Sequence, residues 1–292
     1  MPARWHAIAA ATAHDAAARV PFLVLDGDEV LEAGSVARAH LAALARWPAE
    51  LRIDAAGVTL RVPAGARDAF FAEANTWLHR EGLLVGWRSE TYPVDALADR
   101  RRLARFERTA SRFWGTLTYG AHCNGYVAGA DGRPEALWIA RRAWSKPTDP
   151  GLLDNLIGGG VPADQSPLEA VLREGWEEAG LAPRQMLDLQ PGYVLRLGRD
   201  IPEGFQREHL SVFDLALPVG LTPQNQDGEV GELMLLPIAE ALALAATDAM
   251  TVDAGLVTLD FALRHRLLPA AALEALETAI AGLRIGPTML AH

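Results

Sequence analysis

One stretch of the chain, residues 158–180, restricts the fold more than any other. It opens with Gly158-Gly159-Gly160 and continues into Ser166-Pro167-Leu168-Glu169. Serine caps a helix, proline fits the first helical position, and a glutamate three residues after the cap completes a capping box. Gly180 supplies the usual residue for a helix end. The pattern predicts a glycine-rich loop followed by a helix between Ser166 and Gly180.

The acidic side of this helix breaks the rules of helix design. Glu174, Glu177 and Glu178 lie within about one turn of each other, and Arg173 can pair with Glu177 alone. Like charges four residues apart repel, and anions near the end of a helix are disfavoured by its dipole. A solvated acidic face is the ordinary interpretation. A hard divalent cation such as Mg²⁺ is the functional one, because it converts the repulsion into attraction.

The same residues resemble the signature of the Nudix hydrolase superfamily, G-x5-E-x7-R-E-U-x-E-E-x-G-U, where U is bulky and apolar. The matching positions are Gly159, Arg173, Glu174, Glu177, Glu178, Gly180 and Leu181. Two positions depart from it. Gln165 replaces the first glutamate, which implies a change in loop anchoring more than in catalysis, and Gly175 replaces the apolar residue.

This resemblance implies roles for the helix residues. Glu174 and Glu178 are the principal metal ligands, Glu177 assists, and the Gly159 carbonyl is a further ligand; Arg173 orients the glutamates. The metal is Mg²⁺, with Mn²⁺ as the alternative. It activates a water that attacks a phosphorus atom of a diphosphate.

The general base stays open between the helix and a later loop. Residues 227–232 place Glu229 and Glu232 in a turn before an expected strand. An ordinary acidic turn is the competing interpretation of these two residues.

A narrower resemblance covers most of the chain. It is to the Nudix subgroup with a thiamine-pyrophosphokinase-related N-terminal domain, some members of which hydrolyse damaged thiamine diphosphate. The segments that carry it are residues 86–94, 124–127, 137–142, 146–151 and 153–155. It implies that Arg141, Arg142 and Lys146 contact phosphate. Trp114, Trp138 and Trp144 are candidates for stacking on a ring, against the commoner fate of core packing.

The expected fold class is α+β, with a Nudix-type αβα sandwich domain over residues 113–292. A smaller α/β N-terminal domain is expected over residues 1–112. Periodicity predicts helices and strands. The expected helices are residues 3–18, 35–46, 67–80, 238–246, 252–265 and 270–283. The expected strands are residues 22–25, 51–53, 58–62, 116–119, 124–128, 136–141, 190–197, 209–216 and 232–237.

Composition limits the partners. The formal net charge of -10 argues against nucleic acid, and no apolar run is long enough to span a membrane. The single cysteine, Cys123, is expected to be buried and inert, and it suits a reducing cytoplasm. Six arginines crowd residues 99–112. They form either a solvated connector or a basic wall facing phosphates at the domain junction.

The sequence therefore predicts a Mg²⁺-dependent enzyme that hydrolyses the phosphoanhydride bond of a small diphosphate. A damaged thiamine diphosphate is one candidate substrate, and nucleoside diphosphate derivatives such as ADP-ribose are another. A Nudix-fold binding or regulatory module without catalysis is the rival from a different class. A homodimer is expected by family analogy alone.

Overall fold

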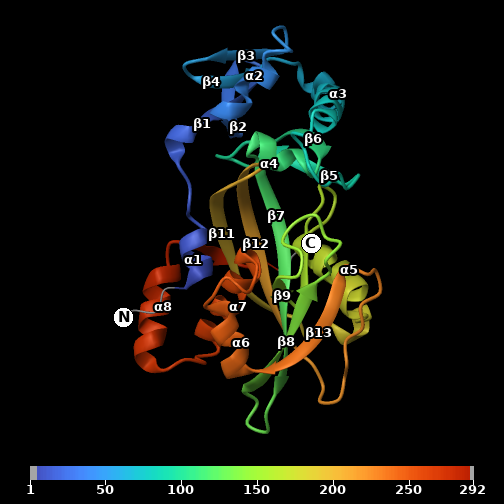
Figure 1. Ribbon diagram of the computed structural model, residues 1–292, viewed down its shortest axis with the longest axis vertical. Coiled ribbons are helices and arrows are strands. Elements are labelled where there is room, and N and C mark those ends of the chain that lie inside the picture. Colours follow the sequence, from blue (N-terminus) through green and yellow to red (C-terminus); the bar gives the residue numbers. More distant parts are fainter. Residues whose placement is uncertain (1–4, 290–292) are drawn as a thin grey trace.

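The computed structural model describes residues 5–289 of the chain. Two bodies lie end to end, with the N-terminal strands at the top of Figure 1 and a larger sheet with its helices below. The upper body has its own hydrophobic core, which runs from Val20 to Trp114. Further apolar clusters line the two faces of the larger sheet.

The N-terminal body is built on a four-stranded sheet in the order β2-β1-β4-β3. Its strands are β1 (Arg19–Asp26), β2 (Glu29–Ala37), β3 (Leu51–Asp54) and β4 (Gly57–Leu60). Helix α3 (Arg67–Arg80) was predicted at the same bounds, and it buries Phe70, Phe71, Ala74 and Leu78. Their spacing of three and four residues explains why this face packs against the core.

The helix predicted over residues 35–46 is wrong in its first part. Glu29–Ala37 is strand β2, paired antiparallel with β1, and only Arg38–His40 and α2 (Leu41–Leu44) are helical. The turn at Asp26-Gly27-Asp28 returns the chain directly onto β1, with Gly27 at φ +63°. Pairing with a neighbouring strand thus outweighs a local helix signal.

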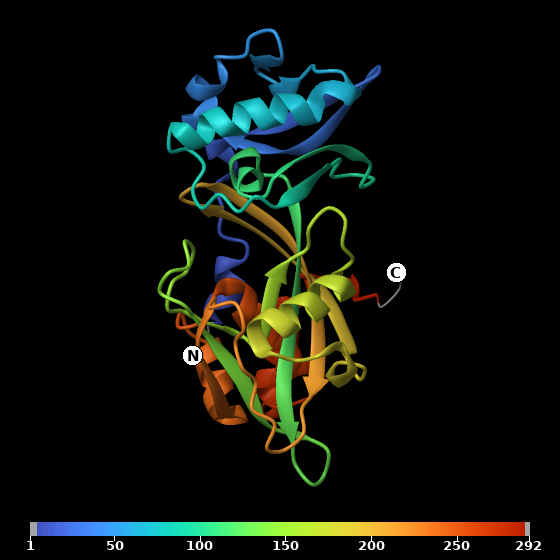
Figure 2. The ribbon, with the colours of Figure 1, turned by 90° about the vertical axis from the view of Figure 1, so that its right-hand side faces the viewer.

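The arginine-rich segment is not a connector without structure. Arg102–Glu107 forms β6, which pairs with β5 (Thr91–Asp95) in a hairpin. A short helix, α4 (Ala110–Trp114), follows and ends at Gly115 in the left-handed conformation. This hairpin and helix lie between the N-terminal sheet and the larger sheet (Figure 2).

The larger sheet has the strand order β13-β8-β7-β12-β11-β14. Its central strands β7 and β12 run parallel, while β10 pairs with β7 and β9 pairs with β8. The strands are β7 (Leu117–Ala128), β8 (Pro134–Arg142), β9 (Leu153–Asn155), β10 (Ile157–Gly160), β11 (Gln190–Ile201), β12 (Gly204–Ala216), β13 (Val230–Pro237) and β14 (Arg284–Pro287). Residues expected as two strands form the single long strand β7.

Both faces of this sheet are covered. On β12, Phe213 and Leu215 join the cluster beneath α5 (Pro167–Ala179), whereas Leu210 and Val212 join the cluster beneath α7 (Val252–Arg264). Alternate side chains of a strand point to opposite faces, so α5 and α7 lie on opposite sides. Helices α6 (Ile238–Ala245) and α8 (Ala270–Ile280) complete the α7 side. The predicted mixed α/β class is confirmed.

The first helix differs from its prediction. Of residues 3–18, the first two lie outside the described chain, and the described part forms α1 (His6–Ala10) and a short 3-10 turn at Ala16–Ala18. Helix α1 packs on α7 at Gly255, where an added Cβ would lie 2.7 Å from the Cβ of Ala7. Trp5 and Ala7 thus join the core of the C-terminal body, and Phe113 joins that of the N-terminal body. The domain boundary at residues 112/113 stays a prediction.

Candidate functional site

Helix α5 begins and ends as its sequence predicts. The Ser166 side chain accepts from the Glu169 backbone N–H at 3.2 Å, and the Glu169 carboxylate accepts from the Ser166 N–H at 2.7 Å. Gly180 closes the helix at φ +65°. This reciprocal cap fixes where the helix starts and therefore which residues face the sheet.

Because the three glycines of β10 have no Cβ, a different side chain lies close to the backbone at each of them. A Cβ at Gly158 would lie 2.8 Å from His122 and 3.2 Å from the Asp154 carboxylate, and one at Gly159 would overlap the Glu174 carboxylate. One at Gly160 would overlap the Tyr92 hydroxyl, which comes from the N-terminal body. The triple glycine is therefore the point at which α5, the central sheet and the N-terminal body meet.

Gly159→Ala is expected to displace the Glu174 carboxylate and to lower turnover by about tenfold or more, because small misplacements of reacting groups are costly. The measurement is kcat for a diphosphate substrate at saturating Mg²⁺. Gly65→Ala is the matched control, since nothing lies within 4 Å of a Cβ there. Equal turnover in the two variants would show that the approach of Glu174 to β10 is unimportant.

Of Glu174, Glu177 and Glu178, the first and the last are withdrawn from solvent. The Glu178 side chain is 6% exposed, and its Oε2 accepts from the Gly158 N–H at 2.8 Å. Burial, followed by the charges of Glu174 and Asp154, raises its pKa well above the ordinary value. Burial also raises the pKa of Glu174. A buried cluster of carboxylates is stable in its ionised form only beside cations.

Arg173 organises the outer side of this cluster. Its guanidinium binds Glu174 Oε1 at 2.9 Å and Glu177 Oε2 at 2.8 Å. Its Nε donates to the Gln165 side-chain oxygen at 3.2 Å. Gln165 therefore still ties the loop to the helix, although it carries no charge. The other departure from the signature, Gly175, lies where a Cβ would meet the sulfur of Met186 at 2.6 Å.

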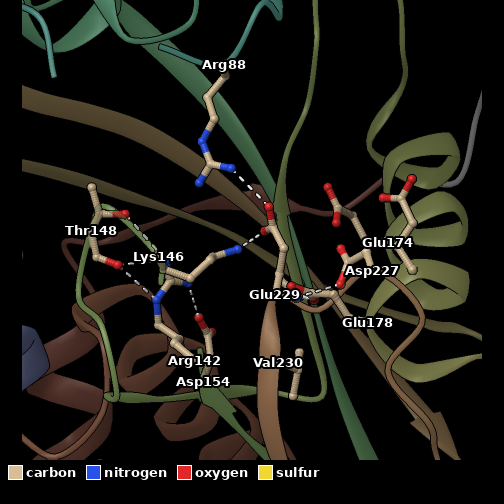
Figure 3. A network of polar contacts seen from close by, with 12 residues as sticks. Arg88, Arg142, Lys146, Thr148, Asp154, Glu174, Glu178, Asp227, Glu229 and Val230 are labelled. Carbon is tan, nitrogen blue, oxygen red and sulfur yellow. Dashed lines mark hydrogen bonds and ion pairs between the residues drawn. The ribbon is translucent and has the colours of Figure 1, made fainter. Parts of the chain in front are cut away.

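Cations face the glutamates across the site (Figure 3). Lys146 forms an ion pair with Glu229, which also accepts from Arg88 Nη1 at 2.9 Å. Arg142 Nη1 binds Asp154 Oδ2 at 2.9 Å, and Arg142 Nη2 donates to the Thr148 carbonyl at 3.0 Å. Lys146 is close enough to stabilise the Glu178 carboxylate electrostatically.

The structure separates Arg141 and Glu232 from this group. Arg141 Nε binds Glu232 Oε2 at 3.1 Å, and Glu232 is more than half exposed. The two residues sit opposite each other on β8 and β13. Arg141 lies next to Arg142 on a strand, so its side chain points to the other face. Of the predicted phosphate contacts, Arg142 and Lys146 come together and Arg141 does not.

The donor chemistry of the cluster suits a hard cation. Among residues 5–289, no group of three or more His, Cys, Asp or Glu side chains is arranged as a complete metal site. Mg²⁺ does not need one, since it is commonly held by one or two carboxylates, waters and substrate phosphates. Glu174 and Glu178 supply two carboxylates beside the glycine strand, so these residues fit Mg²⁺ bound together with a phosphate.

Several residues around the site are not singled out by the signature. Asp154 lies beside Glu178. The N-terminal body contributes three further residues to the site: Arg88, Tyr92 and Arg108. The sequence feature that could have indicated such residues is the density of arginines around residue 108. Of those arginines, Arg102 and others bind nearby carboxylates. Arg108 and Arg112 also pair with carboxylates and in addition line the hollow between the bodies. The solvated connector and the basic wall facing phosphates both stay predictions.

The aromatic and thiol candidates are mostly structural. Trp114 is fully buried and Trp138 is 7% exposed, whereas Trp144 is 79% exposed. Only Trp144 of the three is therefore free to stack on a ligand. Cys123 is buried, as predicted, and burial raises the pKa of its thiol well above the ordinary value.

Known proteins resemble this chain over part of its length. Residues 121–256 match the family described as NUDIX domain. Nudix hydrolase 20, chloroplastic, from Arabidopsis thaliana is 38% identical over 63% of this chain and 49% of its own length. Nudix hydrolase 24, chloroplastic, from the same plant is 36% identical over 65% of this chain and 52% of its own length. The chain thus spans about half the length of these curated relatives.

The structure of DR0079 from Deinococcus radiodurans shows a likeness with a TM-score of 0.44 and 23% identity, over 59% of this chain and 98% of that one. Within the described part of the chain, no helix has the length and hydrophobicity to cross a membrane. The family match includes β10 and α5, where the glutamates lie. Residues 121–256 therefore match the NUDIX domain family, and the chain is similar over part of its length to the Nudix hydrolases.

Proposed function

We propose that this chain is a diphosphohydrolase whose active site is formed by α5, β10 and the loop before β13. The observation that carries the proposal is the withdrawal of Glu174 and Glu178 from solvent beside Gly159 and Gly158, with Lys146 and Arg142 nearby. A buried acidic cluster with raised pKa values is costly for the fold. Such a cost is commonly retained at functional sites.

In this proposal Glu174 and Glu178 hold Mg²⁺, with Glu177 and the Gly159 carbonyl assisting; Mn²⁺ is the alternative ion. The metal lowers the pKa of a water and neutralises charge on the leaving phosphate. Arg173 positions two of the glutamates through its ion pairs. Arg142 and Lys146 bind phosphate oxygens, the first as a fork and the second as a point charge.

Glu229 is the stronger of the two loop candidates for the general base. It lies among Lys146 and Arg88, whereas Glu232 is occupied by Arg141 outside the site. As placed, the Glu229 carboxylate accepts from two cations. A carboxylate in that state is a weak base, so the role requires a phosphate to draw the cations away. Glu229→Gln should then lower kcat more than it raises KM.

The substrate class is a small organic diphosphate. The resemblance to the subgroup with a thiamine-pyrophosphokinase-related N-terminal domain suggests a damaged thiamine diphosphate, and the exposed Trp144 offers a surface for its ring. ADP-ribose and other nucleoside diphosphate derivatives are the alternatives. Arg141 and Glu232 are proposed to lie outside the reaction, as a cross-strand ion pair.

The test is a hydrolysis screen with and without Mg²⁺ over thiamine diphosphate, its oxidised forms, ADP-ribose and common nucleotides. Release of a monophosphate that needs Mg²⁺ is the expected result. Binding of a diphosphate without turnover and without dependence on metal would favour the regulatory-module alternative. A cytoplasmic location and a homodimer both stay predictions.

A further inference from the structure

A small hollow lies between the two bodies, next to the glycine strand. One part, of about 70 Å³, is lined by Arg88, Tyr92 and Thr116 among others, and the next, of about 90 Å³, reaches Gly158 and Asp154. The residues that line both parts are Arg108, Arg112, Thr148, Gln206 and Glu208. Cavities that enclose a whole small-molecule ligand are usually about 300–1,000 Å³. This hollow therefore suits one group of a ligand.

Two hydroxyls on its wall lack a partner. Tyr92 is 2% exposed and Thr116 is 1% exposed, and neither Tyr92 OH nor Thr116 Oγ1 has a hydrogen-bond partner among the described residues. Buried polar groups are nearly always paired with protein, water or ligand. Burial raises the pKa of Tyr92, so its phenol keeps the proton and can donate it.

The charge around these hydroxyls points to an anion. The Arg108 guanidinium lies 5.3 Å from the centre of the Tyr92 ring, and Arg112 lines both parts of the hollow. Each forms one ion pair, Arg108 with Glu90 at 3.0 Å and Arg112 with Glu203 at 3.6 Å. A guanidinium presents five donors, so most of them stay available to a ligand.

The hollow is not wholly basic. Glu208 lies on the wall of both parts, and Asp253 lies on the wall of the part that reaches the glycine strand. Gln206 donates to both carboxylates, at 2.9 Å to Glu208 and at 3.3 Å to Asp253. A phosphoryl group carries both acceptor oxygens and, near neutral pH, a proton that it can donate. It therefore matches a wall of guanidiniums, hydroxyls and carboxylates better than a carboxylate or a halide ion would.

We propose that this hollow is the subsite for a phosphoryl group of the substrate. Tyr92 OH and Thr116 Oγ1 donate to its oxygens, and Arg108 and Arg112 balance its charge. Because Tyr92 touches the backbone at Gly160, that group lies directly beside the strand that carries Gly159. The N-terminal body thus supplies substrate-binding residues and is more than an attached domain. This assignment rests on the proposed diphosphohydrolase function.

The test is calorimetric binding of methylenediphosphonate, a diphosphate analogue that cannot be hydrolysed at its bridge, to the full chain with Mg²⁺. Tyr92→Phe and Thr116→Val each remove one hydroxyl at nearly constant shape. Each is expected to raise Kd by about 3- to 10-fold, the value of one hydrogen bond. The thermal midpoint should stay level or rise in both, because an unpaired buried hydroxyl has been removed.

Two substitutions serve as matched controls. Thr59 Oγ1 is also buried without a partner but belongs to β4, so Thr59→Val should leave Kd unchanged. Tyr126 lies at the far end of β7 beside Phe261, so Tyr126→Phe should do the same. An unchanged Kd in Tyr92→Phe overturns the subsite, and so does a wild-type chain that does not bind the analogue.

The result of this binding test can be told apart from the result of the hydrolysis test of the proposed function. A chain that binds the analogue through Tyr92 and Thr116 but hydrolyses no diphosphate has the subsite without the reaction. A chain that hydrolyses a diphosphate with the same KM and Kd in Tyr92→Phe has the reaction without the subsite.

Discussion

Glu178→Gln should abolish Mg²⁺-dependent hydrolysis, with a fall in kcat of about 100-fold or more, because an amide oxygen carries no charge for a metal. The same change should leave the folded state as stable as before or more stable. Burial and two neighbouring carboxylates raise the pKa of Glu178, so the neutral amide removes a charge that the fold stabilises poorly. The measurements are steady-state turnover and urea unfolding on the same preparation.

Glu277→Gln is the matched control for that substitution. Glu277 is an exposed glutamate on α8, so both turnover and stability should equal those of the wild type. Loss of activity in Glu178→Gln together with a large loss of stability would assign Glu178 a structural role. Retained activity would remove the α5 glutamates from the mechanism.

Asp214→Ala should have the largest effect on folding, lowering the free energy of unfolding by about 3–5 kcal/mol, as expected when one partner of a buried ion pair is removed. Asp214 is 1% exposed on β12. It accepts from Asn124 at 3.0 Å, from Arg264 at 2.9 Å and from His265 at 3.0 Å. These contacts join β7 and β12 to the end of α7. Urea denaturation measures the change, and Asp248→Ala, at an exposed position, should change little.

The effect of Asp214 should depend on pH in a defined direction. Burial raises the pKa of Asp214, but hydrogen bonds from His265 and Arg264 outweigh it and hold the pKa below its ordinary value. A lowered pKa in the folded state gives stability above the unfolded pKa of about 4 and loses it as the pH falls through the folded pKa. The difference between wild type and Asp214→Ala should therefore be constant above about pH 5 and shrink below about pH 4. A difference that grows on acidification would contradict this assignment.

The local signals in the sequence describe α5 well. The Ser166 cap, the Glu169 capping box and the Gly180 end all appear as predicted, because each depends on contacts within one turn. The amphipathic spacing of α3 succeeds for the same reason. At Gly175, which departs from the signature, the Met186 side chain fills the space that a Cβ would take.

Long-range pairing was harder to predict. Glu29–Ala37 became a strand because β1 lies beside it, and Arg102–Glu107 did so because β5 lies beside it. The sequence also could not show which of Arg141 and Arg142 points its side chain toward the site. Their opposite directions depend on which face of β8 turns toward the site, and that is set by the sheet. Nothing in the sequence indicated that Tyr92 lies near the glycines, because only the packing of the two bodies brings its hydroxyl to Gly160.

We expect Glu174 and Glu178 of α5 to hold a divalent cation together with a diphosphate. The most direct test is Mn²⁺ binding followed by electron paramagnetic resonance, with and without methylenediphosphonate, in the wild type and in a Glu174→Gln/Glu178→Gln double variant. In the presence of the analogue, Mn²⁺ should bind tightly to the wild type and about 100-fold or more weakly to the double variant. Equal Mn²⁺ affinity in the two proteins would contradict it.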